Sequence, residues 1–299
     1  MNKAGKRRLN WLGPLLVLIA AVGINTCHAQ TQPAIAWRPA QLTNGSPALF
    51  RVTAPAWMKS LKASWLGHTV TFFYARRERA WFGLGGVPLQ TGPGSYDLRV
   101  TEIFADGRSR EIEKKVRVAK ASYPFATIKV AKQFTEPSQT QLAAIAADKD
   151  VKQKTFSAFS DKRLWSGPFT APVTAPVSAV FGTGRVFNHE VQSRHEGLDY
   201  AVPAGTPVRA IGRGTVLLAR PMFFEGNFVV VDHGQGLLSL YLHLSQFKVE
   251  EGEAVSEGQV LGLSGGTGRA TGAHLHLAVR WQGVYLNPAI LLRLAIPAD

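Results

Sequence analysis

Five residues in the last third of the chain are of types that bind metal ions or transfer protons. They are His195 and Asp199 within a His-Glu-Gly-Leu-Asp run, His243 within Tyr-Leu-His-Leu, and His274 and His276 within His-Leu-His. On a β-strand, residues i and i+2 point to the same face, so the last two histidines would stand side by side. Two imidazoles buried without partners are unfavourable, and a divalent metal ion would satisfy both.

A second group of candidate ligands lies upstream. The spacing of four between His195 and Asp199 would suit one face of a helix, but Gly197, Pro203 and Gly205 favour a loop that enters a strand. Both side chains could then point at one spot. Two histidines and one aspartate make a three-ligand zinc set whose fourth position stays open to water. Nitrogen and carboxylate ligands without sulfur fit zinc better than calcium or copper(I).

Such a site predicts hydrolysis, because zinc lowers the pKa of its bound water towards about 7. The water needs a proton acceptor, and the developing oxyanion needs a stabilising group. The candidates are His243 and whichever histidine of the His-Leu-His pair is not a ligand. Strand alternation predicts that His243 shares a face with Tyr241.

Short strands separated by glycine turns must position these residues. Strand-like runs cover 206–211, 214–219 and 226–233, and the glycine-rich turn at 234–236 predicts a hairpin. No long helical pattern interrupts them. We therefore predict a C-terminal β domain over residues 178–299, so that the fold class is mainly β.

Residues 30–121 also have a strand-rich pattern. Aromatic runs at 70–74 and 80–84 are separated by turn signals from the strands around them. This spacing predicts an accessory β-sandwich of immunoglobulin type, without its disulfide. The aromatic runs are most simply its core, and a carbohydrate-binding surface is the alternative.

Residues 122–177 are predicted to be a linker with one helix. Residues 137–140 have the composition of a helix start, and Pro168, Pro172 and Pro176 predict an extended approach to the last domain. The alternative is that this segment crosses the mouth of the site.

Residues 1–29 have the layout of a secretory signal peptide. A basic head precedes an apolar run over 11–24, and cleavage is expected after Ala29. An uncleaved anchor and a lipoprotein at Cys27 are the alternatives. Cys27 is the only cysteine, so the mature chain would have no disulfide and no thiolate ligand. Any metal site must then use histidine and carboxylate.

The chain is strongly basic, with a formal net charge of +14; the segment 1–29 carries four basic residues and no acid, so removing it leaves +10. A basic exported protein suggests an anionic partner in the cell envelope. The sequence shows no recognition helix or RNA-binding signature, so nucleic acid is not an expected partner. We expect a periplasmic or secreted protein with no stable membrane span after signal cleavage.

Together, the five residues and the glycine-rich runs between them resemble a known family. The His-x-x-x-Asp, Tyr-x-His-Leu and His-Leu-His motifs, in order over about 180–288, are similar to the LytM/lysostaphin-type zinc endopeptidases of peptidase family M23. The export signal and the β-rich N-terminal region resemble Gram-negative envelope members. The resemblance implies a C-terminal LytM-type β-sheet or barrel metallopeptidase domain that binds one zinc ion per chain.

The resemblance also implies a role for each residue. Zinc ligands would be His195, Asp199 and His276, and the catalytic histidines would be His243 and His274. One departure is Ala273, which stands where many relatives have proline, and we expect it to alter the pocket rather than the metal site.

The function implied is hydrolysis of the peptide cross-links of peptidoglycan, whose stem peptides would be the substrate. Three alternatives remain open at this point: a catalytically silent wall-binding module that activates a separate amidase, an enzyme that cuts a glycine-rich protein, and an enzyme that depends on an envelope regulatory protein.

Overall fold

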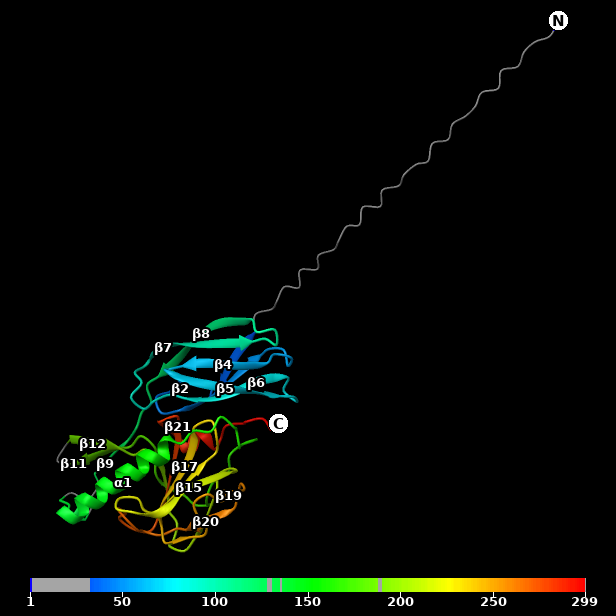
Figure 1. The fold of residues 1–299 in the computed structure, drawn as a ribbon. Helices are drawn as coiled ribbons and strands as arrows, with labels where there is room; N and C mark the ends of the chain where they lie inside the picture. Colours follow the sequence, from blue (N-terminus) through cyan, green and yellow to red (C-terminus); the bar gives the residue numbers. More distant parts are fainter. Residues whose placement is uncertain (2–32, 128–130, 135, 188–189, 299) are drawn as a thin grey trace. The chain divides into compact units, whose positions relative to one another are not determined.

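The strands of the fold are arranged mainly in two large sheets, one from each half of the chain (Figure 1). The computed structural model describes Met1 and residues 33–127, 131–134, 136–187 and 190–298. Residues 2–29 of the predicted signal peptide, Cys27 among them, lie outside these ranges. The mainly β fold class is confirmed. No helix in the described ranges is long and apolar enough to span a membrane.

The N-terminal sheet has eight strands in the order β1-β3-β6-β5-β4-β7-β8-β2. Their bounds are β1 Ala34–Arg38, β2 Leu42–Thr43, β3 Pro47–Thr53, β4 Ser60–Trp65, β5 His68–Ala75, β6 Ala80–Gly86, β7 Gly94–Ile103 and β8 Ser109–Ala119. Strand β5 pairs with β4 through 68–71 and with β6 through 72–75, so it joins the two parts of this sheet. The immunoglobulin type of this region, with its boundaries at 30 and 121, stays a prediction.

Alternating burial explains why these segments are strands. Along β4, Leu61, Ala63 and Trp65 are buried while the residues between them are not. The indole of Trp65 packs edge-on against Phe50 at 5.4 Å and donates its Nε1–H to the Gly86 carbonyl at 2.8 Å. The aromatic residues therefore supply the core, and the satisfied indole donor avoids the cost of a buried unpaired polar group.

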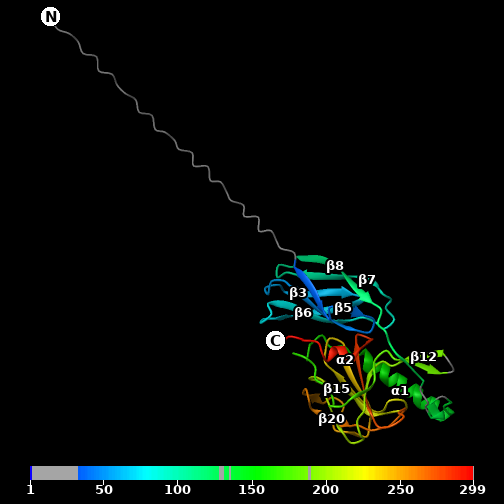
Figure 2. The ribbon, with the colours of Figure 1, turned by 180° about the vertical axis from the view of Figure 1, so that it is seen from behind.

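The segment after β8 contains strand β9 (Phe125–Thr127), the short 3-10 helix η1 (Lys132–Phe134) and helix α1 (Gln139–Ser157). Helix α1 begins with a capping box, in which the Ser138 hydroxyl accepts from the Gln141 N–H and the Gln141 side chain accepts from the Ser138 N–H. Figure 2 shows the fold from behind, with α1 and strand β12 (Glu190–Arg194) labelled.

The C-terminal sheet also has eight strands, in the order β10-β13-β21-β17-β16-β15-β19, with β22 paired to β21. Their bounds are β10 Val177–Ala179, β13 Leu198–Tyr200, β15 Gly214–Met222, β16 Gly226–Asp232, β17 Leu237–Leu244, β19 Ala254–Val255, β21 Leu275–Trp281 and β22 Val284–Leu286.

Two three-stranded sheets and one short helix complete the architecture. The sheets have the orders β12-β11-β9 and β14-β20-β18. The remaining bounds are β11 Gly184–Phe187, β14 Pro207–Arg209, β18 Gln246–Phe247, β20 Val260–Leu263 and α2 Pro288–Leu291.

The two large sheets share one hydrophobic core within the compact unit that begins at Pro33. The His68 ring lies 5.2 Å from Trp281, at the end of the strand that carries His276. The Asn287 N–H donates to the Gly45 carbonyl at 2.7 Å. The N-terminal sheet thus packs against the C-terminal end of β21.

Candidate metal centre and active-site groove

The segment that joins β12 to β13 supplies the first residues of the site. His195 follows β12, and its backbone exchanges hydrogen bonds with Thr183 and Gly182 at 2.9 and 2.7 Å. The side chain of His195 is 2% exposed. Asp199 lies at the centre of β13, directly opposite His276 on the neighbouring strand β21. Backbone pairing therefore sets the aspartate beside the second histidine.

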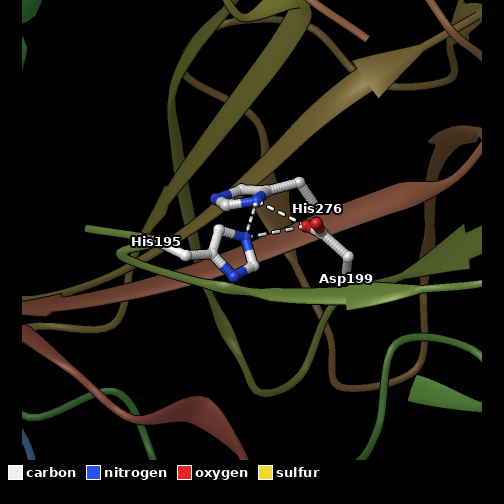
Figure 3. Close-up of side chains that lie close together, drawn as sticks. All are labelled: His195, Asp199 and His276. Carbon is white, nitrogen blue, oxygen red and sulfur yellow. Dashed lines mark hydrogen bonds and ion pairs between the residues drawn. The ribbon is translucent and has the colours of Figure 1, made fainter. Parts of the chain in front are cut away.

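Three donor atoms converge between these strands (Figure 3). The Asp199 Oδ1 atom lies 2.7 Å from His276 Nδ1 and 3.0 Å from His195 Nε2. His195 Nε2 and His276 Nδ1 are themselves 3.0 Å apart. Two ring nitrogens and a carboxylate oxygen, contributed by the segment 195–199 and by β21, thus face one common point.

A hydrogen bond orients the first imidazole. His195 Nδ1 lies 2.9 Å from the Val180 carbonyl oxygen, which can only accept. The proton is therefore assigned to Nδ1, and the lone pair of Nε2 points at the other two donor atoms. Histidines that bind metal ions are commonly held by such a bond from the second ring nitrogen.

Electrostatics favour the metal-binding protonation states. Desolvation by itself would raise the pKa of Asp199, but the hydrogen bonds with His195 and His276 outweigh it and hold the pKa well below its usual range. Burial lowers the pKa of His276, although the Asp199 carboxylate acts in the opposite direction. An ionised aspartate and a neutral imidazole are the forms that coordinate a cation.

The donor set fits a zinc ion. Two ligands at about 2.0–2.1 Å from one ion, at a tetrahedral angle, lie about 3.3 Å apart. The separations of 2.7–3.0 Å among the three atoms are close to this value. A divalent cation would also resolve the close approach of two ring nitrogens. His195, Asp199 and His276 are therefore the residues that could hold it.

His243 reaches the same site by an unusual backbone conformation. Its φ is 64°, in the left-handed region that a residue with a side chain rarely adopts. The pairing of β16 with β17 shifts register between Asn227 and Val229, and the His243 N–H donates to the Glu225 carbonyl at 2.9 Å. Such strain is retained where the surrounding structure enforces it, and it clusters at functional sites.

This conformation corrects the expected strand alternation. Tyr241 pairs with Leu277 and is fully buried, whereas Leu242 pairs with His276. By alternation, His243 would follow Tyr241 into the core. Instead its ring lies 4.8 Å from that of His274 and 6.2 Å from that of His276. The left-handed residue after a register shift turns the side chain to the opposite face of the sheet.

Backbone carbonyls anchor both candidate catalytic histidines. His243 Nδ1 lies 2.8 Å from the Thr267 carbonyl oxygen, and His274 Nδ1 lies 2.9 Å from that of Gly272. Each Nδ1 is therefore a donor, which leaves each Nε2 as an acceptor. Burial lowers the pKa of His243 to about 3. The His243 ring is thus neutral at physiological pH, as a proton acceptor must be.

The five predicted residues therefore lie together, and all of them line one groove of about 1120 Å³. Strand β9, the β11–β12 hairpin and helix α1 also contribute to its walls, with Lys152 and Phe156 coming from α1. Lys152 Nζ pairs with Glu225 Oε1 at 2.5 Å, and the Arg280 guanidinium lies 4.5 Å from the Phe156 ring. The segment predicted as a linker thus forms part of the groove.

Two residues of the site were not identified from the sequence. Gly197 lies directly against the His276 ring, and Thr267 both holds His243 and donates its hydroxyl to the Leu244 carbonyl at 2.7 Å. A glycine between two candidate ligands was the one signal available for Gly197. No spacing rule distinguishes Thr267 from other loop threonines. His189, six residues before His195 in the sequence, lies outside the described residues.

The part of the chain that carries these residues is similar to known proteins. Residues 193–288 match the family described as Peptidase family M23. The peptidoglycan DD-endopeptidase ShyA of Vibrio cholerae is 46% identical over 102 residues, which are 33% of this chain and 24% of that protein. The DD-carboxypeptidase/endopeptidase Mpg of Neisseria meningitidis is 46% identical over 94 residues, 31% of this chain and 22% of that protein. The matches thus span about a quarter of the length of these relatives.

A solved structure is similar over most of the chain. It is a crystal structure from Pseudomonas aeruginosa assigned to peptidase M23, with 31% identity and a TM-score of 0.65 over 84% of this chain and 95% of that one. The shared fold defines the class, a β-sheet peptidase with an added N-terminal β region. The chain belongs to peptidase family M23.

Proposed function

We propose that this protein is an exported zinc metalloendopeptidase that hydrolyses the peptide cross-links of peptidoglycan. The observation that carries the proposal is the convergence of three metal-binding donor atoms, within 3.0 Å of one another, beside two carbonyl-anchored histidines in one groove. Relatives named peptidoglycan endopeptidases support the substrate, through their similarity to the part of the chain that carries the site.

His195, Asp199 and His276 would hold the zinc ion. When bound, zinc supplies Lewis acidity, which lowers the pKa of water and polarises a carbonyl oxygen. The chain's own contribution is to fix the ligands: the Val180 carbonyl orients His195, and ladder pairing with β21 places Asp199. Because the ligand side chains are mostly buried, the site excludes bulk water around them.

His243 and His274 would move the protons. The neutral His243 ring presents Nε2, because its Nδ1–H is held by Thr267, so it can accept a proton from the attacking water. Once protonated, the ring donates from both nitrogens and can return the proton to the leaving amine. His274, 4.8 Å away and anchored at Gly272, can assist the water or the developing oxyanion. Water and peptide thus give a carboxylic acid and an amine, and the histidines are regenerated.

Digestion of purified peptidoglycan tests the proposal. Residues 30–299 would be incubated with the polymer, with and without a zinc chelator, and the products read by mass spectrometry. We expect chelator-sensitive loss of cross-linked fragments, and the fragment masses would name the bond cut. Tight binding to the polymer and bound zinc without cleavage would instead indicate a silent wall-binding module or an enzyme that awaits a partner.

Export is tested separately, because the predicted signal peptide lies outside the described residues. The intact mass of the protein recovered from the periplasm or medium should correspond to a chain that begins at Gln30. Recovery of the full-length chain in the membrane fraction would contradict cleavage after Ala29.

A further inference from the structure

Four basic side chains line the groove around the metal-binding cluster, and three of them already have partners. Lys152 is paired with Glu225. The Arg194 guanidinium donates to the Gly182 carbonyl at 2.9 Å. The exposed Arg269 lies over the Phe224 ring, with its guanidinium carbon 4.8 Å from the ring centre. The fourth is Arg185.

Arg185 differs from the other three. It lies on β11, opposite Ser193 of β12, at the point where the register of this hairpin shifts. It is partly buried, and burial lowers the pKa of its guanidinium. Within the described ranges, no hydrogen bond or ion pair reaches this guanidinium. A partly desolvated cation without a partner is unfavourable, and an anionic ligand would relieve it.

The charge of Arg185 acts on the metal-binding cluster. Arg185 lines the same groove as His195, Asp199 and His276, and the Asp199 carboxylate acts electrostatically on its guanidinium. The guanidinium is therefore close enough to meet a substrate held at the cluster. Arg269 lines the same groove, and its charge also acts on Arg185.

Among the described residues, no acid of the groove forms an ion pair with Arg185. Asp199 is engaged by two histidines, and Glu225 is engaged by Lys152. Glu196 also lines the groove, and its carboxylate forms no ion pair among the residues with a described position. Arg185 is thus left with capacity to bind a carboxylate through a bidentate pair of hydrogen bonds.

We propose that Arg185 is a specificity-determining residue that binds a free carboxylate of an acidic peptide substrate next to the bond that is cut. This inference rests on the proposed peptidase function and names the chemistry that the groove selects. A peptide that carries the carboxylate is held with its scissile bond at the metal cluster, and the same peptide with a carboxamide there loses the charge-assisted pair.

Matched substrates and variants test the inference. The substrates are a cross-linked peptide dimer from peptidoglycan and the same dimer with its free carboxylates converted to carboxamides. The variants are Arg185→Gln and, as a charge-matched control, Arg117→Gln, whose side chain is exposed on β8 outside the groove. We expect the unmodified chain to prefer the carboxylate dimer by about tenfold or more in kcat/KM. Arg185→Gln should remove this preference mainly through KM, and Arg117→Gln should keep it.

A binding measurement that needs no turnover tests this inference separately from the proposed function. Calorimetry of the two dimers with His243→Ala protein, with and without Arg185→Gln, needs no cleavage. If the unmodified chain cuts neither dimer but His243→Ala still prefers the carboxylate dimer in an Arg185-dependent way, the proposed function fails, whereas the binding of a free carboxylate by Arg185 stands. Equal binding of the two dimers, absence of binding, or a preference that survives Arg185→Gln would overturn it.

Discussion

Gly197 packs directly against the imidazole of His276. A Cβ atom at residue 197 would lie 2.4 Å from both Cε1 and Nε2 of that ring and 2.7 Å from the Leu277 carbonyl oxygen. The ring cannot move away freely, because its Nδ1 is held by Asp199 at 2.7 Å. The glycine between the two upstream ligands therefore makes room for the third ligand.

The first prediction is that Gly197→Ala impairs metal binding. The methyl group must displace either the His276 ring or the β21 backbone, so the three donor atoms no longer converge. We expect zinc affinity to fall about 10- to 100-fold, as it does when the support of a metal ligand is disturbed. Competition with a chromogenic chelator measures this. Gly92→Ala is the control, because a Cβ there meets nothing within 4 Å. Equal zinc affinity of the two variants would refute the packing argument.

Removal of a ligand should have a larger effect. His195→Ala, Asp199→Ala and His276→Ala each delete one of three converging donors, and we expect zinc affinity to fall at least about 100-fold with loss of activity. Metal content after dialysis, measured by atomic emission, checks this. A variant that retained one zinc per chain would remove that residue from the ligand set.

The third prediction separates turnover from metal binding. His243→Ala should retain zinc, because its ring is not among the three converging donors, yet kcat should fall about 100- to 10,000-fold with the loss of the proton acceptor. His274→Ala should behave similarly. The circular dichroism spectrum should be unchanged in both. Full activity of His243→Ala would contradict its catalytic role.

The buried His233 should make the free energy of unfolding depend on pH. It is fully buried, with Nε2 at 2.7 Å from Ser239 Oγ and Nδ1 at 2.7 Å from the Arg213 carbonyl, and burial lowers its pKa to about 4. In the unfolded chain the pKa is near 6.5, so the unfolded state takes up a proton first as the pH falls. The contribution of the neutral His233 to the stability of the folded state is complete above about pH 6.5 and is lost as the pH falls through 4.

Urea unfolding at several pH values measures this contribution. As the pH falls from 7.5 to 5, protonation of His233 in the unfolded state should lower the free energy of unfolding by about 2 kcal/mol. His233→Gln removes the titrating group, so the variant should show a correspondingly weaker dependence over this range, even if it is less stable throughout. Identical pH dependence in both proteins would show that His233 is not a buried neutral imidazole.

The fifth prediction concerns the attachment of helix α1 to the groove. Lys152 pairs with Glu225, whose carbonyl in turn accepts the N–H of His243, and Glu225 Oε2 has no hydrogen-bond partner among the described residues. Lys152→Met would leave this carboxylate partly buried and unpaired, at a cost of about 1–2 kcal/mol. Lys149→Met, on the exposed side of the same helix, should change stability by less than about 0.5 kcal/mol. Equal urea midpoints for the two variants would rule out a structural role for the pair.

Local patterns were enough to predict strand β21. Alternation predicts one face made of Leu275, Leu277, Val279 and Trp281, and all four are buried in the core. The same period of two places His276 on the other face, opposite Asp199. These predictions hold because the direction of a side chain on a regular strand follows from backbone geometry alone.

Local patterns predicted helix α1 itself, but they did not predict its position against the groove or the face of His243. The face of His243 depends on a register shift between β16 and β17 and on the hydrogen bond that its Nδ1–H donates to the Thr267 carbonyl, 24 residues away. The position of α1 depends on contacts with residues such as Glu225, 73 residues from Lys152. Neither contact leaves a periodic signal along the chain.

The sequence by itself determined the types and spacing of the metal-binding residues and the mainly β class, because both follow from side-chain chemistry and the two-residue period of strands. The tertiary structure alone decided which side chains meet: Asp199 and His276 come together across 77 residues of sequence, Gly197 makes room for the ring, and Arg185 faces the groove without a partner among the described residues. Strand pairing and core packing create these distances, and they act between segments far apart in the chain.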